Sequence, residues 1–131
     1  MDLMIGVSLP RQQALLQAGL PVPAPVNARG LIDTGASHTM VDSGIITSLQ
    51  LMVTGVAPIL TVSTGVTPQQ ANQYDAQIII THPEMSFSFH AHPVIECALH
   101  HQGFDVLIGR DILSRCLLVY DGSNGTFSLA F

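Results

Sequence analysis

The most informative segment of the chain reads Gly30-Leu31-Ile32-Asp33-Thr34-Gly35-Ala36-Ser37-His38-Thr39-Met40-Val41. Its apolar pair, Leu31 and Ile32, is typical of the end of a buried strand. Gly35 has no Cβ, so the chain can turn sharply just after the acid. Asp33 would then lie at the tip of a buried strand, where an ionised carboxylate is poorly solvated and becomes a candidate for catalysis. Because Asp-x-Gly also occurs in ordinary turns, the tripeptide alone leaves both interpretations open.

The composition predicts one mostly β domain over residues 1–131. Hydrophobic residues make up 47% of the chain and charged residues only 10%, and 8 Pro and 11 Gly are scattered between short β-prone runs. The chain has no Lys and a net charge of −5, so we expect neither a nucleic-acid partner nor binding to an anionic membrane. With so few surface charges, we expect apolar surface that pairs with something, most simply a second copy of the chain.

Signals for targeting and for disulfides are absent from the sequence. No apolar run reaches the length of about 18 residues that a membrane-spanning helix needs, and the first residues lack the basic region and cleavage site of a secretory signal. We therefore expect a cytoplasmic protein. Cys97 and Cys116 lie among apolar residues without metal-like spacing, which favours buried free thiols; a disulfide or a reactive role is the alternative.

The expected elements are short strands separated by turns. We expect strands over residues 3–9, 27–32, 59–63, 74–81, 86–90, 93–99, 104–108, 116–120 and 126–131, and short helical segments over 11–18, 43–51 and 110–115. Residues 20–26 carry three prolines at alternate positions, which predicts an extended loop. The polar residues 64–73 predict the turn of a long hairpin.

A second segment, far along the chain, gives the first its context. It reads Val106-Leu107-Ile108-Gly109-Arg110-Asp111-Ile112-Leu113. Together the two segments resemble the motifs of the retropepsin-like aspartic proteases, the single-domain family of retroviral proteases and their bacterial relatives. That family carries Asp-Thr/Ser-Gly-Ala early, then a flap hairpin, then two apolar residues followed by Gly and a short helix. The order and spacing of these features carry the resemblance over residues 3–131.

The resemblance implies an all-β closed barrel with a flap hairpin over residues 61–80 and one short C-terminal helix, assembled as a homodimer. It implies an aspartic endopeptidase whose catalytic motif is Asp33, Thr34 and Gly35, with no cofactor. Two neighbouring carboxylates cannot both ionise cheaply, so they share a proton and can supply the base and the acid of peptide hydrolysis. Because the chain has one Asp-Thr-Gly, the second carboxylate should be Asp33 of another copy across a two-fold axis.

The implied substrate is an extended peptide with apolar side chains around the scissile bond. The residues implied to contact the peptide are Ala36 and Ser37 after the catalytic motif, Thr64, Gly65 and Val66 at the flap tip, and Ile108 in the wall of the substrate cleft. Met40 is a further candidate for that wall. Packing in the core is the alternative for Ile108, Val66 and Met40. Ala36 lacks the hydroxyl that a serine would offer to Asp33, so we expect a milder acidic optimum than in relatives with serine.

Three departures from the family pattern affect other expectations. Many retroviral relatives have an acid where this chain has Ser37, and Arg110 pairs with it; we expect Arg110 to form an ion pair with Asp111 or with an acid of the partner chain instead. Relatives close the dimer with terminal strands. Residues 126–131 fit that use, and the N-terminal strand is a second candidate. The flap glycines of many relatives are reduced here to Gly65.

Two other functions compete with the protease. A domain of the same fold kept for dimerisation or peptide binding, without turnover, would have no use for a buried acid pair, and the intact Asp-Thr-Gly argues against it. A metal hydrolase could use His90 and His92 on one strand, with Glu96 and the His100-His101 pair downstream. No fourth ligand has convincing spacing, so we expect no metal.

Overall fold

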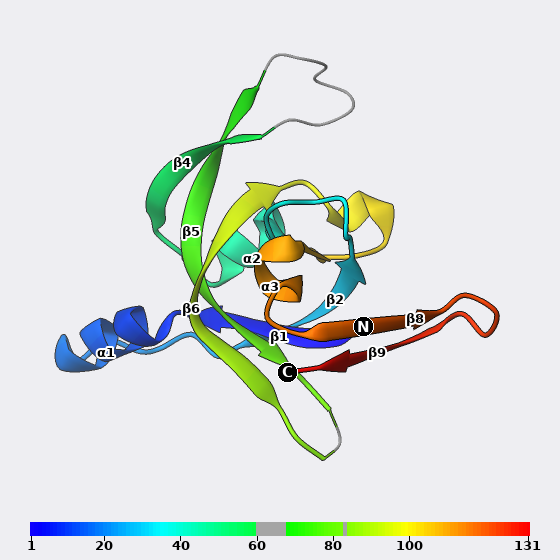
Figure 1. Ribbon diagram of the computed structural model, residues 1–131. Coiled ribbons are helices and arrows are strands. Elements are labelled where there is room, and N and C mark those ends of the chain that lie inside the picture. Colours follow the sequence, from blue (N-terminus) through cyan, green and yellow to red (C-terminus); the bar gives the residue numbers. More distant parts are fainter. Residues whose placement is uncertain (60–67, 83) are drawn as a thin grey trace.

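The computed structural model describes residues 1–59, 68–82 and 84–131. Its main body is a closed barrel built from the strands β1 (Asp2–Val7), β2 (Val26–Ile32), β3 (Met40–Asp42), β5 (Gln69–Ile80), β6 (Phe87–Cys97) and β7 (Val106–Ile108) (Figure 1). The strand order β1-β2-β7-β3-β6-β5 closes on itself because β1 also pairs with β5. The pairs β2–β7 and β3–β6 are parallel, and the other barrel pairs are antiparallel. The expected all-β barrel is therefore confirmed.

Alternation of apolar and polar residues fills the barrel. Every second residue of β5 from Tyr74 to Ile80 is buried, and Leu3 and Ile5 of β1 and Ile108 of β7 meet them in one continuous core. Burying an aliphatic side chain of this size stabilises a fold by about 1.5–3 kcal/mol. The core therefore fixes the ends of β2 and β7, from which the two motif segments emerge.

The flap hairpin is formed by β4 (Val53–Ile59) and the first half of β5, which pair from Val53–Tyr74 to Ile59–Gln69. Its arms extend beyond the barrel (Figure 1). The hairpin expected between the motifs is present, although its first strand begins before the expected residues 59–63. The expected tip, Thr64-Gly65-Val66, lies outside the described residues.

Strand β6 is one long strand where two were expected. Its register with β5 shifts between the pairs Ala76–His92 and Ile78–Phe89, so three steps along β6 face two along β5. This extra residue is a β-bulge, and it reverses which side chains face inward. Phe89 and His92 are buried, whereas His90 is exposed.

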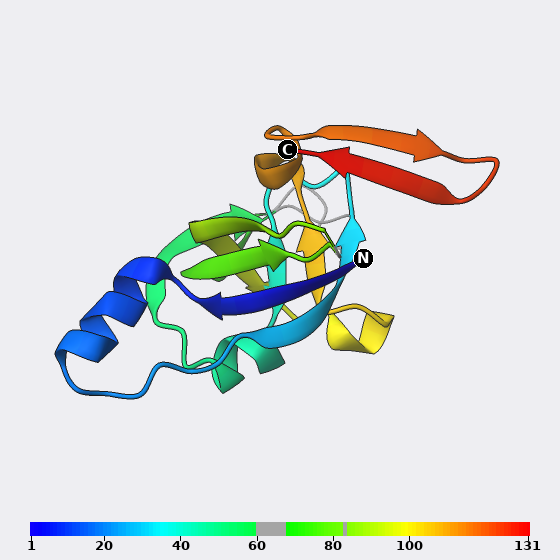
Figure 2. The same ribbon diagram turned by 90° about the horizontal axis from the view of Figure 1, so that it is seen from below.

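The described residues form more helices around the barrel than the single C-terminal helix that the resemblance implied. Besides the C-terminal α3 (Arg110–Leu113), the described residues form α1 (Leu9–Gln17), α2 (Ser43–Ser48) and the 3-10 turn η1 (His100–Gln102). Asp42 caps α2 by accepting the Gly44 N–H at 2.8 Å. Helix α1 buries none of its residues and lies to one side of the barrel (Figures 1 and 2). No helix in the described part of the chain has the length and apolarity needed to cross a bilayer.

The last two strands, β8 (Leu117–Asp121) and β9 (Thr126–Ala130), form a separate hairpin that projects from the barrel (Figures 1 and 2). Phe131 anchors its base by stacking on Phe87, with ring centroids 4.3 Å apart. The N-terminal strand was the other candidate for closing a dimer. That expectation is wrong, because β1 pairs with β2 on one edge and β5 on the other.

Both cysteines are free and half-buried. The expectation of free thiols is confirmed, although neither is fully enclosed. Burial raises the pKa of the thiols of Cys97 and Cys116. Both therefore remain protonated thiols at neutral pH.

Candidate active site

Asp33 lies directly after β2, in a loop that ends at Thr39. Its backbone N–H donates to the carbonyl of Ile108 at 3.0 Å, which ties the loop to the end of β7. Its carboxylate Oδ1 accepts the N–H of Gly35 at 2.8 Å and the N–H of Ala36 at 3.3 Å. Oδ2 accepts no hydrogen bond from the described residues. The carboxylate is thus oriented through one oxygen, and the other is left for a reacting group.

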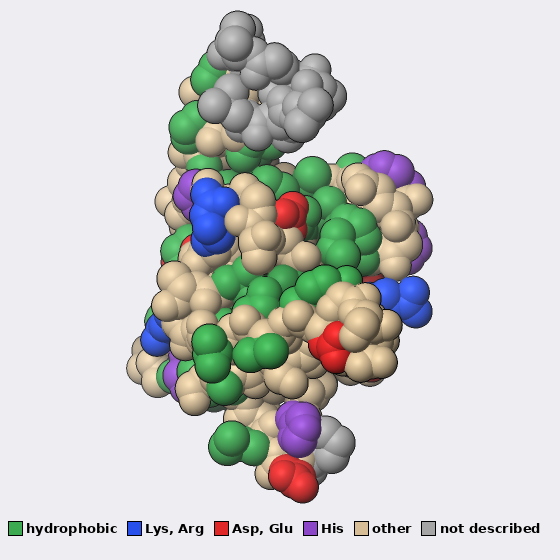
Figure 3. Space-filling model, turned by 45° about the vertical axis from the view of Figure 1, so that its right-hand side comes forward, with side chains coloured by type: hydrophobic (Ala, Val, Ile, Leu, Met, Phe, Trp, Pro, Cys, Tyr) green, Lys and Arg blue, Asp and Glu red, His purple; other side chains and the backbone are tan. Residues whose placement is uncertain are grey.

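The surface around Asp33 is open in a single protomer. Thr34, Gly35 and Ser37 are exposed, Asp33 is half-buried, and Leu31 just before the loop has 46% of its surface exposed. The space-filling view shows hydrophobic side chains spread across the middle of one face with few charged ones among them (Figure 3). A second body covering this surface would enclose the carboxylate.

Arg110 binds the loop that starts at Asp33. One guanidinium nitrogen, Nη1, donates to the carbonyls of Thr34 at 2.8 Å and Gly35 at 2.9 Å, and Nη2 donates to Ser37 Oγ at 2.8 Å. The expected ion pair between Arg110 and Asp111 is wrong, because the carboxylate of Asp111 points to other partners. With serine at position 37, the guanidinium turns to the loop carbonyls. A contact with an acid of a second copy stays a prediction.

The true partners of Asp111 are Thr39 and His92, which sequence reasoning missed. Asp111 accepts the Thr39 hydroxyl on Oδ1 at 2.7 Å and the Thr39 N–H on Oδ2 at 2.8 Å, and Oδ2 also lies 3.1 Å from His92 Nε2. Burial acts to raise the pKa of Asp111, but the hydrogen bonds from His92 and Thr39 and the His92 charge outweigh it and lower the pKa to about 2. Together, Asp111, Thr39 and His92 hold the end of the loop that starts at Asp33.

Gly109 lets the second motif approach the loop that carries Asp33. A Cβ at this position would lie 2.5 Å from the backbone carbon of His38 and 2.6 Å from its oxygen. The Gly109 N–H also donates to the hydroxyl of Thr39 at 3.1 Å. Any larger residue at position 109 would push the loop away from the barrel.

The predicted site residues fall into three groups. Those from Asp33 to Ser37 come together in one loop at the end of β2, against Gly109 and Arg110. Ile108 is fully buried in the barrel core, so its side chain packs there and reaches no open surface of the protomer, while Met40 is half-buried. Thr64, Gly65 and Val66 lie outside the described residues.

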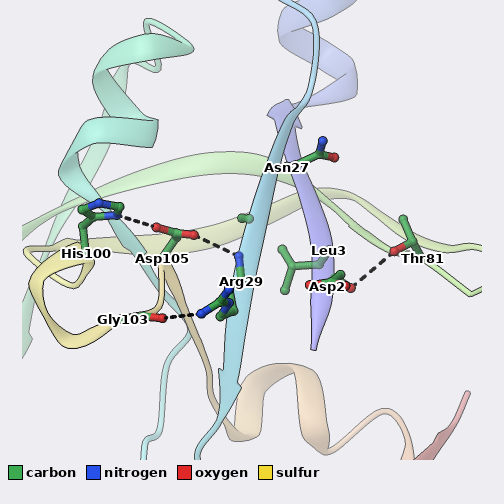
Figure 4. A pocket seen from close by; sticks show the side chains of 9 residues that line it. Asp2, Leu3, Asn27, Arg29, Thr81, His100, Gly103 and Asp105 are labelled. Carbon is green, nitrogen blue, oxygen red and sulfur yellow. Dashed lines mark hydrogen bonds and ion pairs between the residues drawn. The ribbon is translucent and has the colours of Figure 1, made fainter.

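An open depression of about 690 Å³ lies elsewhere on the barrel, along β1, β2 and η1, and no residue of the catalytic loop lines it (Figure 4). Its polar groups bond to one another: His100 Nδ1 lies 2.9 Å from Asp105 Oδ1, and the Arg29 N–H donates to Asp105 Oδ2 at 3.0 Å. The contact with Asp105 raises the pKa of His100. No cluster of His, Cys, Asp and Glu able to hold a metal occurs in the described ranges.

The chain was compared with known proteins. A search of curated protein sequences finds no match. Among solved structures, the retroviral protease-like domain of Ddi1 from Leishmania major is similar, with a TM-score of 0.47, 16% sequence identity, and coverage of 98% of this chain and 86% of that one. The family model described as retroviral aspartyl protease matches residues 12–129. Since this match spans nearly the whole chain, including both motif segments, the chain belongs to the retroviral aspartyl protease family.

Proposed function

We propose that the chain is an aspartic endopeptidase that acts as a homodimer, with Asp33 of each protomer at the centre. One observation carries the proposal: the Asp33 carboxylate is oriented by the N–H groups of Gly35 and Ala36 on Oδ1, while Oδ2 accepts nothing from the described residues. A carboxylate in an ordinary Asp-Gly turn needs no such open oxygen in an exposed loop. Family membership adds to this support.

Two such carboxylates facing each other would share one proton. The ionised Asp33 takes a proton from water as the water oxygen attacks the peptide carbonyl carbon, and the protonated Asp33 donates to the carbonyl oxygen. The tetrahedral adduct then collapses: the C–N bond breaks, and the amine nitrogen receives a proton from one carboxyl group. One hydroxyl of the adduct gives its proton to the other carboxylate as the carboxylic acid product forms, so the dyad again holds one shared proton. No cofactor takes part in this scheme.

A second copy is the natural source of the other carboxylate. The loop beside Asp33 is open to solvent, and the β8–β9 hairpin, formed by residues 117–130, leaves large apolar side chains exposed. A two-stranded hairpin is marginally stable alone in water, so its outer half gains stability when covered. This favours the C-terminal hairpin as the surface that closes the dimer.

The substrate in this proposal is an extended peptide with apolar side chains next to the cleaved bond. Ala36 and Ser37 would contact its backbone from below. The hairpin of β4 and β5 would cover it from above, and closing over the peptide would exclude water from the reaction. Thr64, Gly65 and Val66 are the proposed contacts at the hairpin tip.

The test is cleavage of an unbiased peptide mixture between about pH 3 and pH 7. We expect cuts between apolar residues by the wild type and none by Asp33→Asn, which should fold normally because the asparagine oxygen can still accept the Gly35 N–H. Asp2→Asn, at an exposed site on β1, is the matched control and should cleave like the wild type. A folded wild-type dimer that cuts nothing at any pH would instead favour the binding and dimerisation domain.

A further inference from the structure

We propose that His92, Asp111 and Thr39 form a buried clamp that holds the catalytic loop in its working position at acid pH. All three are positioning residues, since none of them touches the carboxylate of Asp33. The inference rests on the proposed function, because it gives the clamp the task of keeping the Asp33 loop in place. It adds a histidine that neither motif segment contains.

The clamp joins three separate parts of the chain at one carboxylate. Thr39 ends the loop that Asp33 begins, Asp111 lies in the first turn of α3, and His92 comes from the middle of β6. Thr39 donates to the carboxylate through both its N–H and its hydroxyl, and its hydroxyl also accepts the Gly109 N–H. The far end of the catalytic loop is therefore fixed to the barrel through Asp111.

His92 reaches the clamp because of the bulge in β6. With regular alternation after the buried Phe89, position 91 would face inward and position 92 outward. The extra residue in the register between Phe89 and His92 reverses this, and His92 is 8% exposed. A bulge that turns one histidine onto a half-buried carboxylate is a local departure of the kind that occurs next to functional sites.

The protonation states in the clamp follow from its geometry. The pKa of Asp111 is lowered to about 2, so this carboxylate is ionised and can only accept hydrogen bonds. His92 must therefore present a proton on Nε2. Because the pKa is depressed in the folded protein, the clamp's contribution to stability is complete above the unfolded value of about 3.9 and is lost as pH falls through the folded value. The clamp thus stays ionised in the range where a catalytic dyad would share its proton.

The surroundings leave His92 as the one basic side chain that contacts Asp111 among the described residues. Arg110, its neighbour on α3, sends its guanidinium to the loop carbonyls instead. Arg115 lies 5.0 Å above the ring of Phe89, which itself packs edge-on against His92. From β5, the residue paired with His92 is the apolar Ala76. Within the described ranges, no charged side chain other than His92 contacts the Asp111 carboxylate.

The first test follows the amide resonances of Thr39 and Gly109 by NMR as the pH of the wild type, His92→Gln and His90→Gln is lowered. Glutamine can keep a hydrogen bond to Asp111 but carries no charge, so we expect the amides of His92→Gln to change about one pH unit higher than those of the wild type. His90→Gln alters an exposed histidine on the same strand and should titrate like the wild type. Identical midpoints in all three proteins would overturn the proposal.

A second test uses the threonine. Thr39→Val removes two hydrogen bonds of the clamp and keeps the shape of the side chain, whereas Thr39→Ser keeps the hydroxyl. We expect Thr39→Val to lower kcat about tenfold or more with a smaller change in KM, and Thr39→Ser to restore most of it. Equal rates for valine and serine in folded proteins would count against the clamp. If the wild type cleaves no peptide, the proposed function fails, but the amide titration still decides whether the clamp exists.

Discussion

Gly109 sets the distance between the two motif segments, and its substitution gives a sharp test at the scale of one residue. In Gly109→Ala the new Cβ would lie 2.5 Å from the backbone of His38, and backbone atoms cannot move aside as a flexible side chain can. We expect a loss of about 1–3 kcal/mol in the free energy of unfolding and a much larger fall in peptide cleavage, because the loop that carries Asp33 must shift. Chemical denaturation and kcat/KM measure the two effects.

Gly55→Ala is the matched control for this substitution. A Cβ there would meet Gln73 at ordinary contact distances of 3.8 Å and more, so stability and the loop around Asp33 should be unchanged. If Gly109→Ala cleaved peptides as fast as Gly55→Ala, the close approach at position 109 would not control the loop.

At the scale of single residues, local pattern placed Asp33, Thr34 and Gly35 in one loop after a strand, and the structure has them there. Their catalytic role stays a proposal. The partners of Arg110 were not predicted, because a guanidinium binds whatever oxygens the fold brings near, and these come from the backbone of the loop. His92 could not be recognised, since only the bulge in β6 turns it inward.

At the scale of elements, we predict that the β8–β9 hairpin closes the dimer. Tyr120 and Phe127 face each other across its strands and are 70% and 43% exposed, on the side that carries Leu118 and Leu129 toward its base. Replacing both aromatics with threonine keeps the strand propensity but removes apolar surface. Burying each ring is worth about 1.5 kcal/mol or more, and a symmetric dimer would bury both rings of both copies. We therefore expect the dimer dissociation constant to rise about 10⁴-fold. Analytical ultracentrifugation over a range of concentrations measures it.

Leu16→Ser is the control for a general effect of surface polarity. Leu16 lies on α1 and is 67% exposed, on the other side of the barrel from the hairpin (Figure 1). The Leu16→Ser variant should leave the dissociation constant of the dimer unchanged. Equal weakening by both variants, or by neither, would show that the hairpin does not close the dimer.

Among the elements, those with regular alternation were predicted best. The half of β5 from Tyr74 and strand β7 were identified, because each buries residues in the core. The first half of β5, residues 69–73, was expected to be part of the turn, because most of its side chains are polar and exposed. Strand β4 was placed too late in the chain, because most of its side chains are exposed and give no period. The joining of residues 86–90 and 93–99 into one strand escaped prediction, since the bulge breaks the period and Pro93 suggested an end.

The whole molecule offers a test that does not depend on any interface residue. If each active site needs Asp33 from two copies, mixing the wild type with Asp33→Asn lets inactive mixed dimers form. With equal amounts and full exchange, we expect activity per wild-type protomer to fall to about half, and further with more mutant. The fall should follow the rate of subunit exchange, which is measured by delaying the assay after mixing.

A protein that acts as a monomer would give the opposite result, because added Asp33→Asn would leave the wild-type rate unchanged. Adding bovine serum albumin at the same concentration controls for crowding and adsorption. At this scale the sequence predicted the barrel and the hairpin between the two motif segments, and the need for a partner copy stays a prediction. The orientation of the C-terminal hairpin depended on the stacking of Phe131 on Phe87, which no local pattern predicts.

Helix α1 has a practical consequence for biosensor design. It buries no side chain, and it lies on the side of the barrel opposite the β8–β9 hairpin in both ribbon views (Figures 1 and 2). The chain contains no lysine, so Gln13→Lys, at an exposed helical position, would introduce the only side-chain amine. Amine coupling through that lysine would attach molecules to a chip with the β8–β9 hairpin facing the solution. The α-amino group of Met1, which donates to the carbonyl of Gly30 at 2.8 Å, is the competing amine.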